Sequence, residues 1–210
     1  MPIVLIALIT AAMTPVFSCE TKETAVNSQH HSETVNRTEP YPVATFAGGC
    51  FWGVEHNFRR VPGVLATQVG FMGGHVKNPT YRQVCYEDTG HAEVVHLRYD
   101  PNTVSYEQLV RIFFKLHDPT TPNRQGPDIG PQYRSAIFTH TPDQRETARQ
   151  VKARLDEAKA FRRPIVTEIT PADTFWMAED YHQQYIEKNP ARRCHMVDFQ
   201  EIKKILREKE

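Results

Sequence analysis

The sequence lacks an excess of charge of either sign, an internal repeat and a long apolar run. Lys and Arg together number 25, and Asp and Glu together also number 25. A nucleic-acid-binding protein normally carries a basic excess or a basic stripe, so no nucleic-acid partner is expected. The 210 residues, of which 40% are hydrophobic, suffice for one domain with a buried core and for terminal extensions.

The N-terminal apolar run, Ile3–Ala12, is too short for a membrane span, which needs about 20 residues. It has the length of a signal-peptide core. The run leads to Val16–Cys19, where the small Ser18 precedes Cys19 as in a bacterial lipoprotein cleavage site. The lack of Lys and Arg at its start and the bulky Phe17 count against this interpretation, and a buried first strand or helix is the alternative.

We expect residues 1–19 to be a signal peptide of the lipoprotein type, with Cys19 as the lipidation site. The protein would then be exported and anchored at the bacterial cell envelope, in the periplasm if the cell is Gram-negative. Residues 20–40 are polar and show no apolar periodicity, which predicts a flexible tether. We interpret His30–His31 within it as a solvated pair rather than as metal ligands. The folded domain is expected over residues 41–198.

Gly and Pro breaks between apolar segments divide the folded domain into short strands and helices. The predicted strands cover residues 43–47, 64–71, 92–99, 134–140 and 166–169. The predicted helices cover residues 50–60, a segment that begins at Ser105, and residues 141–161, 180–188 and 199–210.

The elements up to His140 follow the order β-α-β-β-α-β, which is the split βαβ arrangement. This order predicts an α+β fold with a ferredoxin-like core, helices on one side of a mixed sheet and an irregular C-terminal segment. Ser105 and Gln108 fit a capping box at the start of a helix. The Pro-rich loop from Pro119 to Pro131 is long enough to suggest a function beyond connecting two elements.

Cys50 follows two glycines and begins a predicted helix. Backbone N–H groups and the helix dipole favour an anion there, and helix N-termini lower the pKa values of thiols. The adjacent Phe51 and Trp52 offer an apolar wall beside the sulfur. Position alone leaves two interpretations about even, a reactive nucleophile and a small buried core thiol.

The segment Gly49–Gly53, with the sequence GCFWG, resembles the signature of the peptide methionine sulfoxide reductases of the A class, which reduce the S epimer. Further motifs of that family follow in order, and the resemblance covers roughly residues 43–194. These motifs are Gly70–Gly74 with Phe in place of Tyr, Pro79–Tyr81, Thr89–Glu93, Asp128–Ser135 and Ala178–Tyr185.

The resemblance implies that Cys50 attacks the sulfur of methionine sulfoxide and that Glu93 protonates the departing oxygen. Glu93 would need a pKa raised by desolvation to hold that proton near neutral pH. The family places Tyr81 and Tyr133 on the sulfoxide oxygen, and Phe51 and Trp52 around the methyl group. Three further residues match family positions that orient the site: Asp128, His182 and Tyr185.

The resemblance also implies a second thiol. The sulfenic acid formed at Cys50 condenses readily with another thiol, and Cys194 matches the resolving cysteine of the family. Many members continue with a Gly-rich tail and a further cysteine, whereas here Cys194 is followed by His195, Met196 and a helical segment. An external thiol that resolves Cys50 directly is therefore the alternative. Cys85 is interpreted as a core thiol.

The implied substrate is methionine sulfoxide in proteins or as the free amino acid, and the implied partner is a thioredoxin-like reductant. No metal, cofactor or second subunit is expected. His91 and His96 flank Glu93 in a pattern similar to that of zinc proteases. Their spacing is five on a predicted strand, so they point to opposite faces, whereas zinc ligation needs four on a helix. His91, Glu93 and Val95 share one face.

Two other classes of function stay open from the residues. A cysteine hydrolase or acyltransferase would pair Cys50 with a histidine base and an oxyanion hole, whereas the motifs supply carboxyl and phenol groups. A non-catalytic envelope binding module would use the aromatic residues as a pocket. Consumption of thiol with methionine sulfoxide, hydrolysis of an ester or peptide, or neither, would separate the three.

Overall fold

A computed structural model describes residues 32–33, 41–192, 194 and 197–208 of the chain. The predicted signal peptide with Cys19, and most of the predicted tether, lie outside the described residues. Among the described residues, no helix is long and apolar enough to cross a membrane.

The core of the fold is a β-α-β-β-α-β unit, and its strands lie side by side in the order β3-β4-β2-β7 with every pair antiparallel. This order is that of a ferredoxin-like fold, so the prediction is confirmed. The elements are β2 (Val43–Gly48), α1 (Phe51–Arg59), β3 (Val64–Met72), β4 (Ala92–Tyr99), α3 (Tyr106–Leu116) and β7 (Ser135–Thr139).

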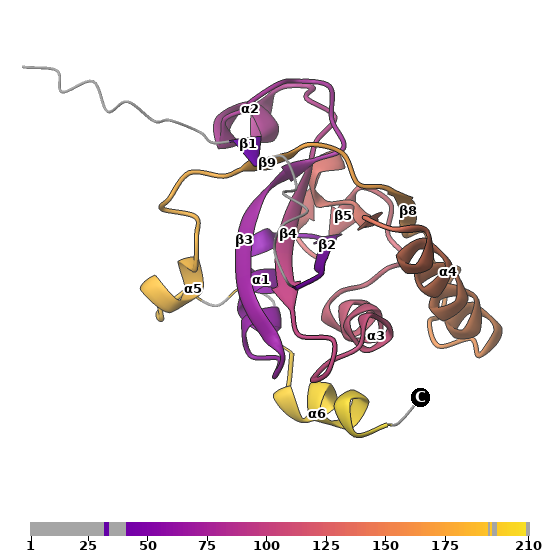
Figure 1. The fold of residues 1–210 in the computed structure, drawn as a ribbon. Coiled ribbons are helices and arrows are strands. Elements are labelled where there is room, and N and C mark those ends of the chain that lie inside the picture. Colours follow the sequence, from indigo (N-terminus) through magenta and orange to yellow (C-terminus); the bar gives the residue numbers. More distant parts are fainter. Residues whose placement is uncertain (1–31, 34–40, 193, 195–196, 209–210) are drawn as a thin grey trace, which may run out of the picture.

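Three strands extend this core into a mixed sheet with the order β1-β9-β3-β4-β2-β7-β8 (Figure 1). Helix α4 (Pro142–Glu157) leads to β8 (Glu168–Pro171), which is parallel to β7. The strand β9 (Phe175–Met177) is antiparallel to β3. β1 (Ser32–Glu33), two residues of the segment predicted as a tether, pairs with β9.

Several short elements differ from the prediction. The loop after β3 contains a short helix, α2 (Tyr81–Tyr86), which Thr80 and Gln83 cap reciprocally. The Pro-rich loop contains a small hairpin of β5 (Arg124–Gln125) and β6 (Asp128–Ile129), and a 3-10 turn, η1 (Pro131–Tyr133), follows. These elements are too short for periodicity to reveal them.

The helix predicted over residues 180–188 is wrong in its first half. Regular helix is confined to α5 (Tyr185–Lys188), and Gln184 before it has a left-handed φ of 50°. The backbone there makes turn hydrogen bonds, from the His182 N–H to the Glu179 carbonyl and from the Gln183 N–H to the Asp180 carbonyl, and it is also held by β3. The Gln183 side chain accepts a hydrogen bond from the Val69 N–H and donates to the Val69 and Ala178 carbonyls.

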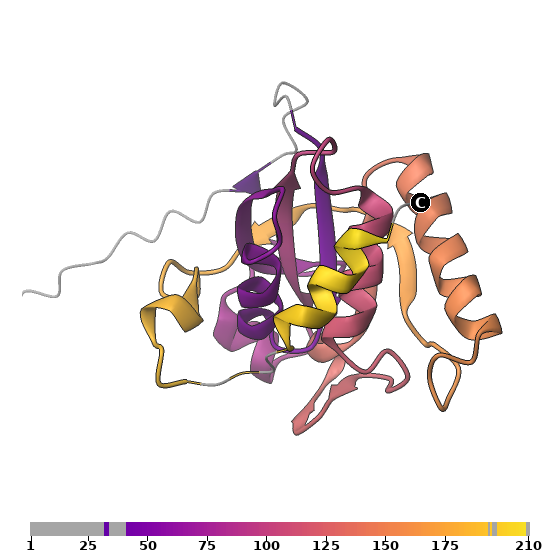
Figure 2. The ribbon, with the colours of Figure 1, turned by 90° about the horizontal axis from the view of Figure 1, so that it is seen from below.

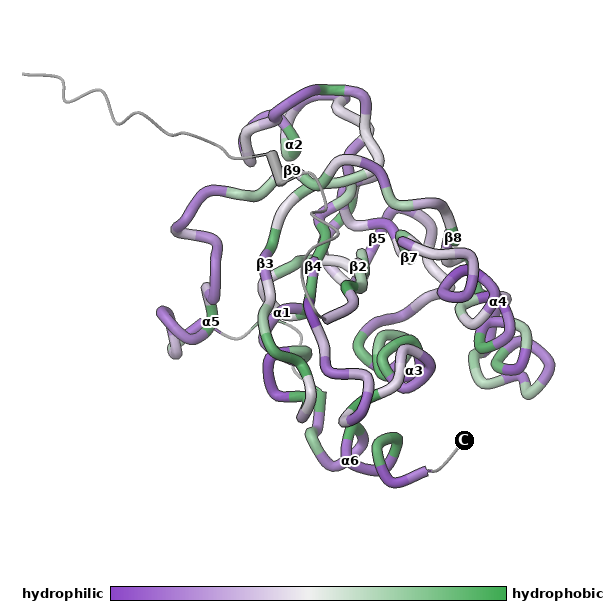
Figure 3. The backbone as a smooth tube through the Cα atoms, viewed as in Figure 1, coloured by the Kyte–Doolittle hydropathy of each residue, from purple (hydrophilic) through white to green (hydrophobic). Residues whose placement is uncertain are grey.

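The helices cover one face of the sheet, as predicted. Phe46 of β2 stacks on Phe58 of α1 and on Phe113 of α3, with ring centroids 5.1 Å apart in both pairs. Residues of α4 and α6 (Phe199–Arg207) belong to the same hydrophobic cluster. Figure 3 shows the hydrophobic residues concentrated in β3, β4 and α3. A smaller apolar cluster, which includes Phe138 and Phe175, lies on the other face.

The alternation along β4 decides which of its side chains can meet α1. Val95 and Leu97 belong to the cluster under the helices, whereas Ala92 and Val94 belong to the opposite cluster. Because side chains alternate in a strand, Glu93 shares the helix side with Val95, as predicted. His96 is on the other side, stacked on Phe175.

The C-terminal helix α6 lies against α3 (Figure 2) and falls within the helix predicted over residues 199–210. Asp198 caps it by accepting a hydrogen bond from the Gln200 N–H. Ile202 and Ile205 are buried, and the Gln108 side chain of α3 donates to the Leu206 carbonyl. The chain after Cys194 is therefore anchored on the body of the protein.

We predict that Ile202→Ala lowers the free energy of unfolding by about 2–5 kcal/mol, because it removes a fully buried side chain. Lys204→Ala on the exposed face of the same helix is the control, with an expected change within about 0.5 kcal/mol. Chemical denaturation measures both. Equal stability of the two variants would show that α6 is not docked.

Candidate active site

Cys50 lies where β2 turns into α1, one residue before the helix begins. Gly49 makes this turn with a φ of 89°, a conformation that favours glycine. A Cβ atom on Gly49 would lie 2.6 Å from the Gln125 side chain, so the β5–β6 hairpin packs directly on the turn. The sequence signal for a cysteine at a helix start is thus confirmed in position.

Glu93 is buried beside this turn, because β4 pairs with β2. The Phe51 backbone N–H donates to Glu93 Oε2 at 3.0 Å, which ties the first residue of α1 to β4. Glu93 Oε1 is buried with no hydrogen-bond partner among the described residues. One carboxyl oxygen is therefore engaged by the backbone, and the other is left for a group that enters the site.

Burial raises the pKa of Glu93 to about 8, since a carboxylate loses its hydration there. The Phe51 N–H opposes this shift, and the electrostatic influence of the nearby Asp128 and Cys194 adds to it. At neutral pH Glu93 therefore holds its proton in most molecules. This is the protonation that the resemblance required of an acid at this position.

The two thiols Cys50 and Cys194 meet in the structure. They share a hydrogen bond, which is the main reason that the pKa of Cys50 is raised, and burial and the Glu93 charge add to it. The Trp52 N–H at the start of α1 acts in the opposite direction but is outweighed. The expectation that the helix start lowers this pKa is therefore wrong for the thiol pair as it stands. Neither cysteine forms a disulfide.

Two phenols lie around the same centre. Tyr81 begins α2 and Tyr133 ends the 3-10 turn η1, and both are partly buried. Burial and the Glu93 charge raise the pKa values of both hydroxyls, so both remain hydrogen-bond donors at neutral pH. The Tyr81 hydroxyl shares a hydrogen bond with the Cys85 thiol. Cys85 therefore lies behind Tyr81 at the edge of the site, and the prediction that it is a core thiol is wrong.

Aromatic rings form a wall next to Cys50. Trp52 stacks on Tyr185 with centroids 3.8 Å apart and an angle of 10° between the planes. Phe51 is buried, with its ring 6.0 Å from that of Tyr81 and 5.3 Å from that of His182. This wall suits a small apolar group such as a methyl.

His182 orients the indole of this wall. Its Nδ1 accepts a hydrogen bond from the Trp52 indole N–H at 3.0 Å, which leaves the proton on Nε2. Burial lowers the pKa of His182 to about 4, so the ring is neutral. Its Nε2 is 4.0 Å from Glu179 Oε2, a distance too long for a hydrogen bond. His182 therefore positions Trp52 and makes no ion pair at neutral pH.

Asp128 lies on the hairpin at the edge of the site. It is partly exposed, and desolvation raises its pKa somewhat. Its charge in turn raises the pKa values of Glu93 and Tyr133, so it lies close to both. All the site residues predicted from the sequence within the described part come together here. Cys19 lies outside the described residues.

Sequence reasoning missed the residues that hold these groups in place. Glu55 is fully buried on α1, accepting from the Thr67 hydroxyl at 2.9 Å and from the Gln184 backbone N–H at 2.8 Å. Glu179 accepts from the Tyr81 backbone N–H at 3.1 Å. The signal that could have revealed Glu55 is a carboxylate among the apolar residues of a short helix.

His91 has a structural role. Its Nδ1 accepts from the Gly74 N–H at 3.1 Å, and its other nitrogen is 2.7 Å from the Val76 carbonyl. A side chain on Gly74 would collide with the His91 ring and with the Thr89 carbonyl, which explains the glycine. Within the described part of the chain, no cluster of three potential metal ligands is present.

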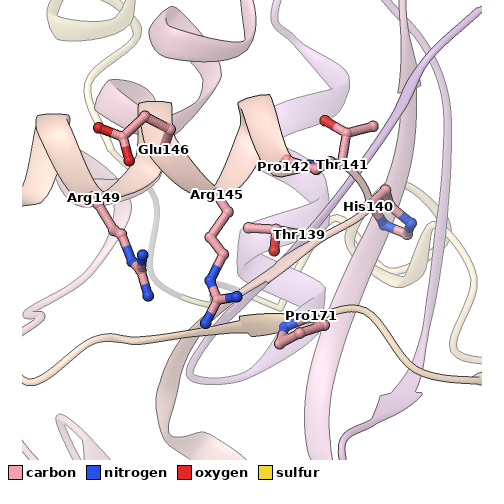
Figure 4. A pocket seen from close by; sticks show the side chains of 8 residues that line it. All are labelled: Thr139, His140, Thr141, Pro142, Arg145, Glu146, Arg149 and Pro171. Atoms are coloured by element: carbon pink, nitrogen blue, oxygen red, sulfur yellow. The ribbon is translucent and has the colours of Figure 1, made fainter.

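A cavity of about 410 Å³ lies apart from this site, between the start of α4 and β8 (Figure 4). Arg145 and Arg149 line it together with His140 and Pro171. None of its lining residues belongs to the cluster around Cys50. The Cys50 cluster is therefore the candidate active site.

A thiol in contact with a second thiol, beside a carboxylic acid that holds its proton, defines a thiol-dependent oxidoreductase. The family model of peptide methionine sulfoxide reductase matches residues 42–210 of the chain. The chain belongs to the peptide methionine sulfoxide reductase family, and the resemblance stated from the motifs is confirmed. Thiol-dependent reduction of methionine sulfoxide is its activity, and neither the hydrolase nor the binding-module alternative finds support.

Individual relatives agree. The chain is 64% identical over 154 residues to the peptide methionine sulfoxide reductase MsrA of Methanoculleus marisnigri, covering 73% of this chain and 94% of the relative. It is 54% identical over 160 residues to MsrA of Geobacter metallireducens, covering 76% and 99%.

Solved structures share the fold. Reduced Mxr1 from Saccharomyces cerevisiae is 33% identical with a TM-score of 0.69, covering 80% of this chain and 94% of that chain. Methionine sulfoxide reductase A of Corynebacterium diphtheriae is 43% identical with a TM-score of 0.68, covering 76% and 80%.

We predict that Glu93→Gln is stabilised relative to the wild type as the pH rises. Between the unfolded pKa of about 4.3 and the folded pKa of about 8, folded Glu93 holds a proton that the unfolded chain has lost. The wild type therefore loses up to about 1.4 kcal/mol per pH unit in this window. Gln keeps the shape and can accept the Phe51 N–H bond without titrating.

Urea unfolding of both proteins at about pH 5.5 and about pH 7.5 measures the difference, with Cys50 and Cys194 reduced throughout. Parallel stability curves over this range would show that Glu93 is already ionised in the folded protein.

Proposed function

We propose that Cys50 and Glu93 together transfer the oxygen of methionine-S-sulfoxide to the Cys50 sulfur. The observation that carries the assignment is the buried, protonated Glu93, with one carboxyl oxygen held by the Phe51 N–H and the other without a partner among the described residues. A sulfoxide oxygen is an acceptor that matches this unused proton. A pKa near the working pH is also the value at which a general acid is most effective.

The reaction balances on these groups alone. Glu93 gives its proton to the sulfoxide oxygen. A bond forms between the Cys50 sulfur and that oxygen, and the S–O bond of the substrate breaks. The thiol proton of Cys50 restores Glu93, so the products are methionine and a sulfenic acid at Cys50. Substrate must separate Cys50 from Cys194 first, which also removes the main contribution to the raised pKa of Cys50.

The surrounding side chains hold the substrate for this step. The hydroxyls of Tyr81 and Tyr133 remain protonated and can donate to the sulfoxide oxygen. Phe51 and Trp52 enclose the methyl group. Tyr185, by stacking, and His182, by its hydrogen bond, keep the indole in place. Burial raises the pKa of Glu93, and Asp128 at the edge of the site adds to this shift.

The second thiol completes the cycle. Cys194 condenses with the sulfenic acid at Cys50 to give a disulfide and water, and its hydrogen bond to Cys50 supports this role. A thioredoxin-like dithiol then reduces the disulfide by thiol exchange. Mxr1 from Saccharomyces cerevisiae, of similar fold, has been solved in complex with Trx2. Every electron comes from a thiol, so the scheme requires no metal or cofactor.

We predict distinct defects for three variants, assayed on the separated S and R epimers of a blocked methionine sulfoxide. Cys50→Ser abolishes reduction of the S epimer. Glu93→Gln lowers the rate on the order of 10²-fold, because a positioned acid is lost. Cys194→Ser releases one equivalent of methionine in a single turnover and accumulates a sulfenic acid, but it does not cycle with thioredoxin.

Cys85→Ser serves as the control. The substitution removes a thiol that is not proposed to react, and the introduced hydroxyl can still form a hydrogen bond with Tyr81. Wild-type turnover of Cys50→Ser would refute the assignment of Cys50 as the nucleophile. Full cycling of Cys194→Ser with thioredoxin would show that Cys194 is structural and that an external thiol resolves Cys50. Mass spectrometry identifies the sulfur species in each variant.

We also propose that the mature protein is exported and tethered to the bacterial envelope by lipid on Cys19, with residues 20–40 as the tether. The apolar run Ile3–Ala12 and the small Ser18 before Cys19 support this proposal. An exported enzyme needs an exported thioredoxin-like donor, because cytosolic thioredoxin cannot reach it.

We predict that the wild type partitions with membranes and that Cys19→Ala does not. Fractionation of cells that express each form measures this, and Ser18→Ala, which keeps a small residue at the site, is the matched control. Recovery of the wild type in the cytosol would refute export.

A further inference from the structure

Exposed apolar side chains adjoin the active site. Tyr86, Ile129 and Tyr181 are 80%, 68% and 58% exposed. Tyr86 follows Cys85, Ile129 follows Asp128, and Tyr181 precedes His182, so each directly neighbours a residue of the site. We refer to these three residues as the apolar rim. The other exposed large apolar residues in the described chain are Tyr41, Leu65 and Val166.

The rim comes from separate walls of the site. The Tyr181 ring lies 4.1 Å from that of His182, which in turn lies 4.2 Å from that of Tyr81. Ile129 belongs to the hairpin whose Gln125 packs on the Cys50 turn. The hairpin and the segment that holds Tyr181, which precedes α5, come from different parts of the chain. Two separate segments of the chain therefore contribute apolar side chains next to the site.

The rim lies outside the hydrophobic core of the protein. None of its residues belongs to either hydrophobic cluster of the protein. Scattered exposed apolar residues are ordinary, but a group of them around a binding site commonly marks an interaction surface.

An extended polypeptide fits this arrangement. A methionine sulfoxide side chain must point into the site to reach Cys50. In an extended chain, the residues two before and two after it point to the same face, about 7 Å away along the backbone on either side. Those side chains therefore face the protein surface next to the site, where the rim residues are exposed.

We propose that the apolar rim binds apolar side chains two residues before and after the oxidised methionine in an extended polypeptide. This inference rests on the proposed function and adds the class of substrate, which is a locally unfolded segment. Apolar neighbours of a methionine are buried in most folded proteins. A site that recognises them directs the reductase to segments that have lost their fold.

The test compares two blocked pentapeptides with methionine-S-sulfoxide at the centre and dithiothreitol as the reductant. One carries Leu and the other Ser at the first and last positions. We expect the wild-type kcat/KM for the Leu peptide to exceed that for the Ser peptide on the order of tenfold, from partial burial of two Leu side chains. A blocked single methionine sulfoxide measures the chemistry alone.

The rim variant combines Ile129→Ser with Tyr181→Ser, and its Leu/Ser ratio should fall to near one. The matched control combines Leu65→Ser with Tyr41→Ser, which removes one aliphatic and one tyrosine side chain. These two residues lie at the end of the sheet near Tyr99, away from Cys50 and Glu93. The control should keep the wild-type ratio.

An unchanged ratio in the rim variant would overturn the proposal. So would a variant that is slowed only with thioredoxin as the reductant, because the rim would then serve the reductant rather than the substrate. Failure of the wild type on all three substrates would refute the proposed function, and the rim proposal with it. The ratio within each variant cancels any effect on the chemistry.

Discussion

The hydrogen bond from the Phe51 N–H to the Glu93 carboxyl is the contact on which the active site depends. It joins the first residue of α1 to the middle of the sheet, and it places a buried acid next to the helix start that carries Cys50. It exists because the split βαβ order makes β2 and β4 neighbours. A slip of one residue in β4 would move Glu93 to the other face of the sheet and leave the thiol without its acid. The same burial that would make a carboxylate unfavourable keeps the proton on Glu93, so packing and acid function have one cause.

Polar side chains outside the reacting groups hold the rest of the site against this pair. Glu55 and Gln183 bind the segment before α5 to α1 and to β3. That segment supplies His182 to Trp52, and the first residue of α5 supplies Tyr185. On the other side of Cys194, the Val197 N–H donates to Asn57 Oδ1 of α1, and α6 packs on α3. Both flanks of the second thiol are therefore attached to the helices that position the first. An anchored helix in place of a Gly-rich tail is compatible with a resolving thiol that lies on Cys50 before substrate arrives.

Much of the fold could be predicted from the sequence because its long elements have strong local signals. The apolar alternation of β4, the capping box at Ser105 and the Gly-Gly turn before Cys50 each depend on neighbours in the chain. The prediction failed where structure depends on distant partners. Residues 180–184 are not helical because Gln183 bonds to β3, and β9 forms because β3 offers it an edge. The fall in the pKa of Cys50 expected from a helix start was reversed by Cys194, a residue near the other end of the chain.

The sequence by itself determined the family and the βαββαβ order and singled out the residues proposed to react, because ordered motifs and local periodicity are properties of the chain alone. The tertiary structure decided the chemical state of those residues. Whether Glu93 is protonated, whether His182 is neutral and whether Cys50 meets a second thiol depend on burial and on groups far away in sequence. Desolvation arises only when strands and helices close around a group, and no pattern of neighbouring residues contains it.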